Sequence, residues 1–199
     1  MDLFNTQSTK LPLNGADVEY HPTPFLGAHP DALFHTLLDE TPWEQRSIRI
    51  HGRDIPQPRL VSWHGDIGYT YSGLNLSPQP MSPTLTLIKE HIESLTGAQF
   101  NTVLLNLYRS GRDSIGMHAD NEPELGPNPT IASVSLGAER DFSFEHKTDK
   151  SQRHRITLGH GSVLVMAGAT QRNWKHGIGK VPGASGRRIN LTFRQTIPI

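Results

Sequence analysis

The sequence predicts an α+β fold in which two helices precede a sheet sandwich or barrel. Apolar residues recur at helical spacing in two segments of the first half of the chain. From Phe100 onward the pattern changes to short runs of β-type composition, separated by segments rich in Gly, Pro, Asn and Asp. These runs are FNTVLLNLY, TIASVSLG, DFSFEH, HRITL, GSVLVMAG and RINLTFR. Helices followed by a series of strands are typical of a sandwich or barrel.

Both helices are expected to be packing elements. The first should begin near Pro30, because proline suits the first helical turn, and should end before Pro42. The second should follow Ser82 as its N-cap and end at Gly97, because glycine commonly stops helices. The expected apolar faces are Leu33, Phe34, Leu37 and Leu38 in the first helix, and Leu85, Ile88, Ile92 and Leu95 in the second.

Length and composition limit the classes of protein and of site. With 199 residues the chain fits one domain, which we expect over residues 17–199 behind a loose N-terminal arm of residues 1–16. The absence of cysteine excludes disulfides, thiolate zinc sites and cysteine nucleophiles. The longest apolar run, Val163 to Ala167, is too short to cross a bilayer, and the N-terminus lacks a signal pattern. We therefore expect a cytoplasmic protein without membrane contact.

The charges give no global indication of a nucleic-acid partner. Nineteen basic residues balance nineteen acidic ones, so any such affinity must come from local clusters. Three clusters are present: Arg46, Arg49, Arg53 and Arg59; Lys147, Lys150, Arg153 and Arg155; and Arg172, Lys175, Lys180 and Arg187. They are either phosphate contacts or solvated faces.

Three His-x-Asp pairs could contribute to a metal site. A non-haem iron(II) oxygenase binds its metal through two histidines and a carboxylate, and side chains two apart on an extended segment point the same way. The pairs are His29/Asp31, His64/Asp66 and His118/Asp120. Chance predicts roughly 0.5 such pairs in a chain of this composition, so we expect at most one to be functional.

The third pair is favoured by its context. His118 and Asp120 follow the strand-and-turn segment LLNLYRSGRDSIGM, and His176 is available later in the chain. Asp31 is better explained by a favourable interaction with the N-terminus of the first helix. The second pair lies in the turn-like stretch WHGDIGY, and nothing downstream supports it more strongly.

The last predicted strand carries an arrangement that could bind an anion. RRINLTFR places Arg188, Asn190, Thr192 and Arg194 on one face. The α-carbons of the two arginines would lie roughly 20 Å apart, and the long side chains could converge on a short dicarboxylate such as 2-oxoglutarate. Asn106 and Tyr108 share a strand face and could donate to carboxylate oxygens. The alternatives are a solvent-facing polar face on an edge strand and an ordinary polar strand face.

The sequence resembles the AlkB family of DNA and RNA dealkylating dioxygenases, most of all the members that repair duplex DNA. The resemblance covers about residues 40–197 and is carried by PQPRL, GYTYSG, NTVLLNLYR, IGMHADNEPELGP, IASVSLGAERDFSFEHK, HGSVLVMAGATQRNWKH and RINLTFR. It implies a double-stranded β-helix, or jelly roll, with helices packed on the outer face. A nucleotide-recognition region would span about 40–80 and a catalytic core about 100–197.

The resemblance also assigns roles to residues. It implies that iron(II) is held by His118, Asp120 and His176, and that oxygen and 2-oxoglutarate are cosubstrates. The implied contacts of 2-oxoglutarate are Asn106, Tyr108, Arg188, Asn190 and Arg194. The implied reaction is demethylation of bases such as 1-methyladenine and 3-methylcytosine in single- or double-stranded DNA, with release of succinate, carbon dioxide and formaldehyde. RNA stays open as a second substrate, and a monomer is expected.

A base inside a duplex must be flipped out before such chemistry can reach it. The resemblance places an aromatic wall at Tyr71, with Tyr69 beside it, and Glu122 as an acceptor for an exocyclic amino group. A finger that fills the gap left by the flipped base maps onto Ile50, His51 and Gly52. The alternatives are ordinary strand core for Tyr71, an ordinary acidic loop residue for Glu122, and a basic hairpin tip for RIHGR.

Two rival functions stay open at the level of sequence. One is a 2-oxoglutarate oxygenase of the same fold that acts on RNA, protein or a small molecule, because function belongs to the site and not to the fold. The other is a catalytically silent nucleic-acid binding module. A pure binder has no use for the intact set His118, Asp120, His176, Arg188 and Arg194.

Overall fold

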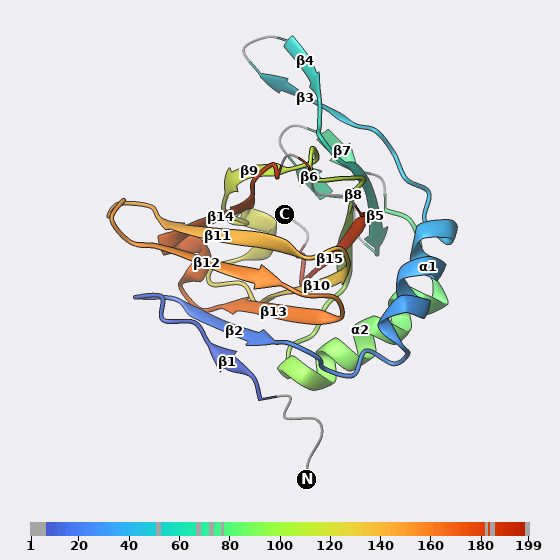
Figure 1. The fold of residues 1–199 in the computed structure, drawn as a ribbon, viewed down its shortest axis with the longest axis horizontal. Helices are drawn as coiled ribbons and strands as arrows, with labels where there is room; N and C mark the ends of the chain where they lie inside the picture. The colour runs from blue at the N-terminus through green and yellow to red at the C-terminus, as the bar shows by residue number, and fades with distance from the viewer. Residues whose placement is uncertain are drawn as a thin grey trace.

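Two antiparallel sheets face each other in the computed structural model, and two helices cover the outer face of the larger sheet (Figure 1). The structure describes residues 7–50, 53–66, 69–71, 74–76, 78–181, 183 and 186–197. This arrangement is the α+β jelly roll that the resemblance implies. No helix in these ranges is long and apolar enough to cross a membrane.

The seven-stranded sheet, here the major sheet, has the order β1-β2-β13-β10-β15-β8-β5. Its strands are β1 (Thr9–Lys10), β2 (Asp17–His21), β13 (Ser162–Ala167), β10 (Ile131–Gly137), β15 (Arg188–Arg194), β8 (Thr102–Tyr108) and β5 (Leu60–Gly65). The minor sheet consists of β12 (Arg153–Leu158), β11 (Arg140–His146), β14 (Trp174–Ile178) and β9 (Ile115–His118), in that order.

Two hairpins stand apart from these sheets. The first pairs β3 (Ser47–Ile50) with β4 (Arg53–Pro56), and the second pairs β6 (Tyr69–Tyr71) with β7 (Leu74–Leu76). The β3–β4 hairpin projects away from the body of the molecule (Figure 1). The helices are α1 (Pro30–Glu40), α2 (Pro83–Thr96) and the short α3 (Thr170–Asn173), and a 3-10 turn spans Pro123–Leu125.

The two long helices form where the sequence predicts them. The Ser82 hydroxyl accepts a hydrogen bond of 3.2 Å from the Leu85 amide, and Gly97 ends α2 in the left-handed conformation. The predicted apolar faces pack against the core, with Phe34 and Leu38 partly buried, except that Leu95 is 37% exposed. Leu95 lies in the last turn of α2, at the margin of the apolar stripe, so its predicted burial is wrong.

The inner strands of the major sheet separate an apolar layer from a polar one. On β15, Ile189, Leu191 and Phe193 pack with the helices, whereas the alternate polar side chains face the minor sheet. Since β15 lies between β10 and β8, all seven of its residues are buried. The alternative of a solvent-facing edge strand is therefore wrong.

The N-terminal arm is only partly as expected. Thr9 and Lys10 pair with β2, and Leu13 is 6% exposed within the core between the sheets. The predicted loose arm is therefore wrong for residues 9–16, because β2 offers an edge to pair with and the core takes an apolar side chain. Residues 1–6 lie outside the described residues.

Candidate metal and cosubstrate site

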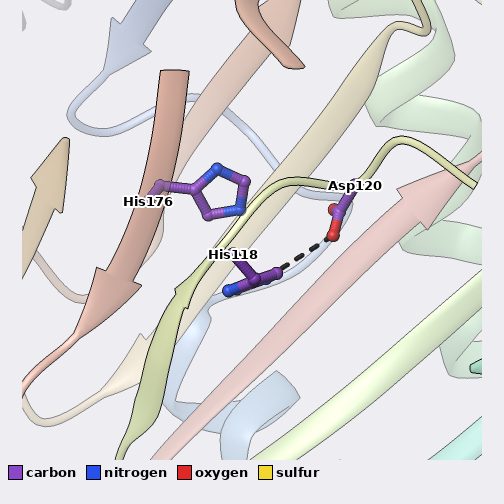
Figure 2. Close-up of side chains that lie close together, drawn as sticks. All are labelled: His118, Asp120 and His176. Atoms are coloured by element: carbon purple, nitrogen blue, oxygen red, sulfur yellow. Dashed lines mark ion pairs between the residues drawn. The ribbon is translucent and has the colours of Figure 1, made fainter. Parts of the chain in front are cut away.

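The three predicted metal ligands come together where β9 pairs with β14. His118 ends β9 and lies opposite His176 of β14, and Asp120 follows on the next loop (Figure 2). One ligand atom from each residue lies within 4.8 Å of the other two. The Nε2 atom of His118 is 3.5 Å from the Oδ1 atom of Asp120.

Both histidine rings are held in a state that leaves a lone pair available. The Nδ1 atom of His118 lies 2.9 Å from the carbonyl oxygen of Gly116, which can only accept, so Nδ1 carries the proton and Nε2 presents its lone pair. His176 stacks on Phe142 at a centroid distance of 5.2 Å. Burial lowers the pKa of His176 to about 3, so its ring is neutral at neutral pH.

Asp120 is held by two hydrogen bonds, and one of its carboxylate oxygens takes part in neither. Its Oδ2 atom accepts a 2.9 Å hydrogen bond from Arg194, and its backbone amide donates to the side-chain oxygen of Gln171 at 3.0 Å. Burial alone would raise the pKa of Asp120, but the surrounding charges, with Arg194 first among them, and the hydrogen bond from Arg194 together outweigh burial and hold that pKa well below the ordinary value. The buried Oδ1 atom has no hydrogen-bond partner among the described residues.

These donors fit a divalent metal ion. An ionised carboxylate oxygen that is buried without a partner is costly, and a cation between it and two imidazole lone pairs removes that cost. Two histidines and one carboxylate on one side of a metal leave its other positions open. The donor set therefore fits iron(II).

Gly177 allows the two ligand-bearing strands to approach closely. A Cβ atom at Gly177 would lie 2.9 Å from the carbonyl oxygens of Ile115 and Gly116. The register of β14 on β9 also shifts between His176 and Ile178. A side chain at position 177 would thus push β9 away from β14 and separate the two histidines.

A cavity between the sheets joins the metal ligands to the predicted cosubstrate residues. It is lined by Leu104, Asn106, Tyr108, Ile115, His118, Asp120, Ser133, Phe142, Met166, His176, Ile178, Asn190, Thr192 and Arg194. Four of the five predicted cosubstrate contacts are in this lining. The fifth, Arg188, lies behind Tyr108, with its guanidinium 5.2 Å from the centroid of the Tyr108 ring.

Arg188 is a buried cation with unused donors. It is 1% exposed, and one terminal nitrogen donates to the Ser135 hydroxyl at 2.9 Å. The Nε and Nη1 atoms have no hydrogen-bond partner among the described residues. Burial lowers the pKa of Arg188 to about 10, which still leaves it charged at neutral pH. A carboxylate would supply both the missing charge and the missing acceptors, so the residues also fit 2-oxoglutarate.

Arg59 is buried, although the sequence grouped it with basic residues that could contact phosphates. It is 4% exposed, and its Nε atom donates to the Oδ1 atom of Asn106 at 2.7 Å. The bond occupies the acceptor end of the Asn106 amide and directs its NH2 group toward other acceptors. Interpreting Arg59 as a phosphate contact is therefore wrong, because its guanidinium is buried and bonded to Asn106.

Asn190 lines the cavity, but its amide is engaged within the major sheet. Its NH2 group donates to the Ser133 hydroxyl at 2.8 Å and to the Val134 carbonyl at 3.0 Å, and its oxygen accepts from Thr192 at 3.0 Å. Ser133 therefore keeps its own hydroxyl hydrogen for a ligand. Sequence reasoning missed Ser133, because alternation shows that IASVSLG is a strand without showing which face meets the cavity.

The predicted substrate contacts are only partly described. The Oε2 atom of Glu122 is buried without a hydrogen-bond partner among the described residues, although Glu122 is not part of the cavity lining. Tyr69 and Tyr71 lie on β6, opposite Leu76 and Leu74. Their side chains, and that of Ile50, are not described; His51 and Gly52 lie outside the described residues.

The rival His-x-Asp pairs have structural roles. His29 caps α1 by accepting from the Asp31 amide. His64 is buried, with its two ring nitrogens 2.9 Å from the Ser62 hydroxyl and from the Pro80 carbonyl. Across the described part of the chain, the group at His118 is the one with metal-site geometry.

Comparisons with known proteins show the family to which the chain belongs. Residues 18–194 match the family described as the 2OG-Fe(II) oxygenase superfamily. Alpha-ketoglutarate-dependent dioxygenase alkB homolog 3 of Bos taurus is 41% identical over 177 residues, covering 84% of this chain and 62% of the relative. The human DNA oxidative demethylase ALKBH2 is 39% identical over 182 residues, covering 85% of this chain and 70% of the relative. The chain therefore belongs to the AlkB family within the 2OG-Fe(II) oxygenase superfamily.

A solved structure of OsALKBH1 shares the fold. It is 18% identical, with a TM-score of 0.63, and the match covers 95% of this chain and 100% of that one. The chain spans about three fifths of the length of the alkB homolog 3 relatives.

Proposed function

We propose that this chain removes alkyl groups from nucleobases in DNA by oxidation, with His118, Asp120 and His176 as the iron(II) ligands. The observation that carries this proposal is the buried Oδ1 atom of Asp120, which has no hydrogen-bond partner among the described residues and lies close to ligand atoms of His118 and His176. The names of the two relatives, a dioxygenase and a DNA demethylase, support the choice of reaction and of DNA.

Bound iron and 2-oxoglutarate, together with oxygen, would supply the oxidation of an N-methyl carbon, with release of succinate, carbon dioxide and formaldehyde. The protein's own residues bind and orient. Arg188 offers its unused donors to one carboxylate, while the NH2 group of Asn106 and the Tyr108 hydroxyl can donate to carboxylate oxygens. Arg194 keeps Asp120 ionised and in place.

Recognition of the base is proposed for the residues that the resemblance indicates. Tyr71 and Tyr69 would stack on the flipped base, and the buried acceptor of Glu122 supports a hydrogen bond to an exocyclic amino group. The finger of Ile50, His51 and Gly52 belongs to the same proposal. Single- and double-stranded DNA are the proposed partners, with RNA as an open alternative. The monomeric state and cytoplasmic location stay predictions.

The test is a panel of substrates with two readouts. Purified protein with iron(II), 2-oxoglutarate and oxygen is incubated with oligonucleotides that carry 1-methyladenine, 3-methylcytosine or an etheno base. Succinate and repaired base are then measured by mass spectrometry. The proposal predicts that both form together. Succinate without base repair would indicate an oxygenase with another substrate, and the absence of both products would contradict the proposed activity and favour a silent nucleic-acid binding module.

A further inference from the structure

Gln171 has a buried side-chain amide that contacts the backbone of the predicted ligand Asp120. It is 1% exposed and belongs to α3, the single helical turn that leads directly into β14. Its Oε1 atom accepts the backbone N–H of Asp120 at 3.0 Å. The Nε2 atom then faces the thioether of Met166 at 3.6 Å, which is a weak acceptor.

The turn that carries Gln171 is itself anchored. The ammonium group of Lys147 donates to the Gln171 carbonyl at 2.7 Å. The Thr170 hydroxyl lies 2.6 Å from the Ala167 carbonyl and accepts the Asp17 amide at 3.0 Å. Because α3 is held by Lys147, which directly follows β11, and by Asp17 of β2, the side chain of Gln171 has a fixed position from which to hold the loop of Asp120.

We propose that Gln171 is a positioning residue of the metal site, which joins the loop of Asp120 to the strand of His176. Its hydrogen bond fixes the position of the Asp120 backbone amide, while the hydrogen bond from Arg194 fixes the orientation of the Asp120 carboxylate. Together the two bonds aim Oδ1 at the space shared with His118. This inference rests on the proposed ligand role of Asp120.

The Gln171 amide combines an acceptor for the Asp120 N–H with an uncharged donor toward Met166. Neither a carboxylate nor an apolar side chain offers both. A leucine at position 171 fills a similar volume but leaves the buried Asp120 amide without an acceptor. A glutamate keeps an acceptor in either protonation state. The expected order of metal affinity is therefore wild type, then Gln171→Glu, then Gln171→Leu. Loss of an outer hydrogen bond of this kind typically weakens metal affinity by about 10- to 100-fold.

The experiment measures metal binding and not turnover. The metal-free full chain is titrated with Co²⁺, and affinity is followed by visible absorption and by calorimetry for wild type, Gln171→Leu, Gln171→Glu and Asp120→Ala. Gln152→Leu is the matched control, because the side-chain amide of Gln152 donates to Asp149 in the β11–β12 turn and its replacement makes the same chemical change away from the site. Melting temperatures of the metal-free variants report on folding separately.

The expected result is about 10- to 100-fold weaker Co²⁺ binding by Gln171→Leu, with a smaller loss for Gln171→Glu and less than about twofold for Gln152→Leu. If Gln171→Leu does not fold, Gln171→Asn, which is too short to reach, takes its place. Wild-type affinity in the folded variant overturns the positioning role. If Asp120→Ala also binds Co²⁺ as wild type does, the ligand assignment and the proposed function fail with it.

Discussion

Arg188 shows at the scale of one residue how burial creates a demand for a ligand. Two of its guanidinium nitrogens have no hydrogen-bond partner among the described residues, although the side chain is buried. Arg188→Met should therefore raise the KM for 2-oxoglutarate far more than the KM for DNA. The loss should reach roughly 2 to 5 kcal/mol, because it leaves a buried carboxylate unpaired.

Steady-state kinetics with each substrate varied in turn measure this split. Arg187→Met is the matched control, since Arg187 is the adjacent arginine and is exposed. An unchanged dependence on 2-oxoglutarate in Arg188→Met would remove Arg188 from the cosubstrate site.

His176 should make the stability of the metal-free protein depend on pH. Its pKa falls from 6.5 to about 3 in the folded chain, so the unfolded chain binds the additional proton between these values. The free energy of unfolding should therefore fall as pH drops from 6.5 toward 3, and this contribution should be constant above 6.5. Urea unfolding across pH 4 to 8, with a chelator present, compares wild type with His176→Gln. Equal pH slopes in the two proteins would contradict the assignment.

The sequence predicted candidate metal ligands and cosubstrate residues that the fold brings together, but it did not predict the residues that support them. Alternation and spacing identify β15 and its arginines, because both follow from backbone geometry. Arg59 and Gln171 have no such signal. A polar residue in a loop or a single helical turn is buried only because strands distant in sequence close over it, and one sequence does not show that closure.

At the scale of elements, β9 and β14 carry the two candidate histidine ligands and are among the strands that the strand pattern missed. The six predicted runs have dense β-branched and apolar composition, and all of them form strands. IGMH and WKHGI are short and contain glycine. Their strand structure comes from pairing with each other and with β11, which no local preference reveals.

Gly177→Ala tests whether the close approach of β9 and β14 builds the metal site. The added methyl group would meet two backbone oxygens at 2.9 Å, and overpacking of this kind costs about 1–3 kcal/mol. We expect weaker Co²⁺ binding and lower turnover. Gly179→Ala is the control, because a Cβ atom there meets nothing within 4 Å. Equal effects of the two substitutions would contradict this role of Gly177.

At the scale of the whole molecule, the β3–β4 hairpin stands out from the two sheets (Figure 1). Ile50 pairs with Arg53 at the end of this hairpin, next to the undescribed residues 51 and 52. A wedge there would offset part of the few kcal/mol needed to unstack a base pair. We predict repair of both single-stranded and duplex DNA, with a weaker duplex preference than in relatives that carry an aromatic finger.

Repair rates for one lesion in both contexts test this prediction. His51→Phe should raise the ratio of duplex to single-strand repair, and the double substitution Ile50→Ala with His51→Ala should lower it. If the double variant slows both contexts equally, the segment contacts phosphates and is not a finger.

The most direct test of the metal site is turnover in single ligand variants. Succinate and repaired base are measured for His118→Ala, Asp120→Ala and His176→Ala, with His29→Ala and His64→Ala as controls from the rival pairs. Removing one of three ligands destroys both metal affinity and open-site geometry, so each of the first three variants should lose turnover while remaining folded. The two controls should keep most of it. Loss of turnover in His64→Ala equal to that in His118→Ala, with both proteins folded, would contradict the assignment of the site.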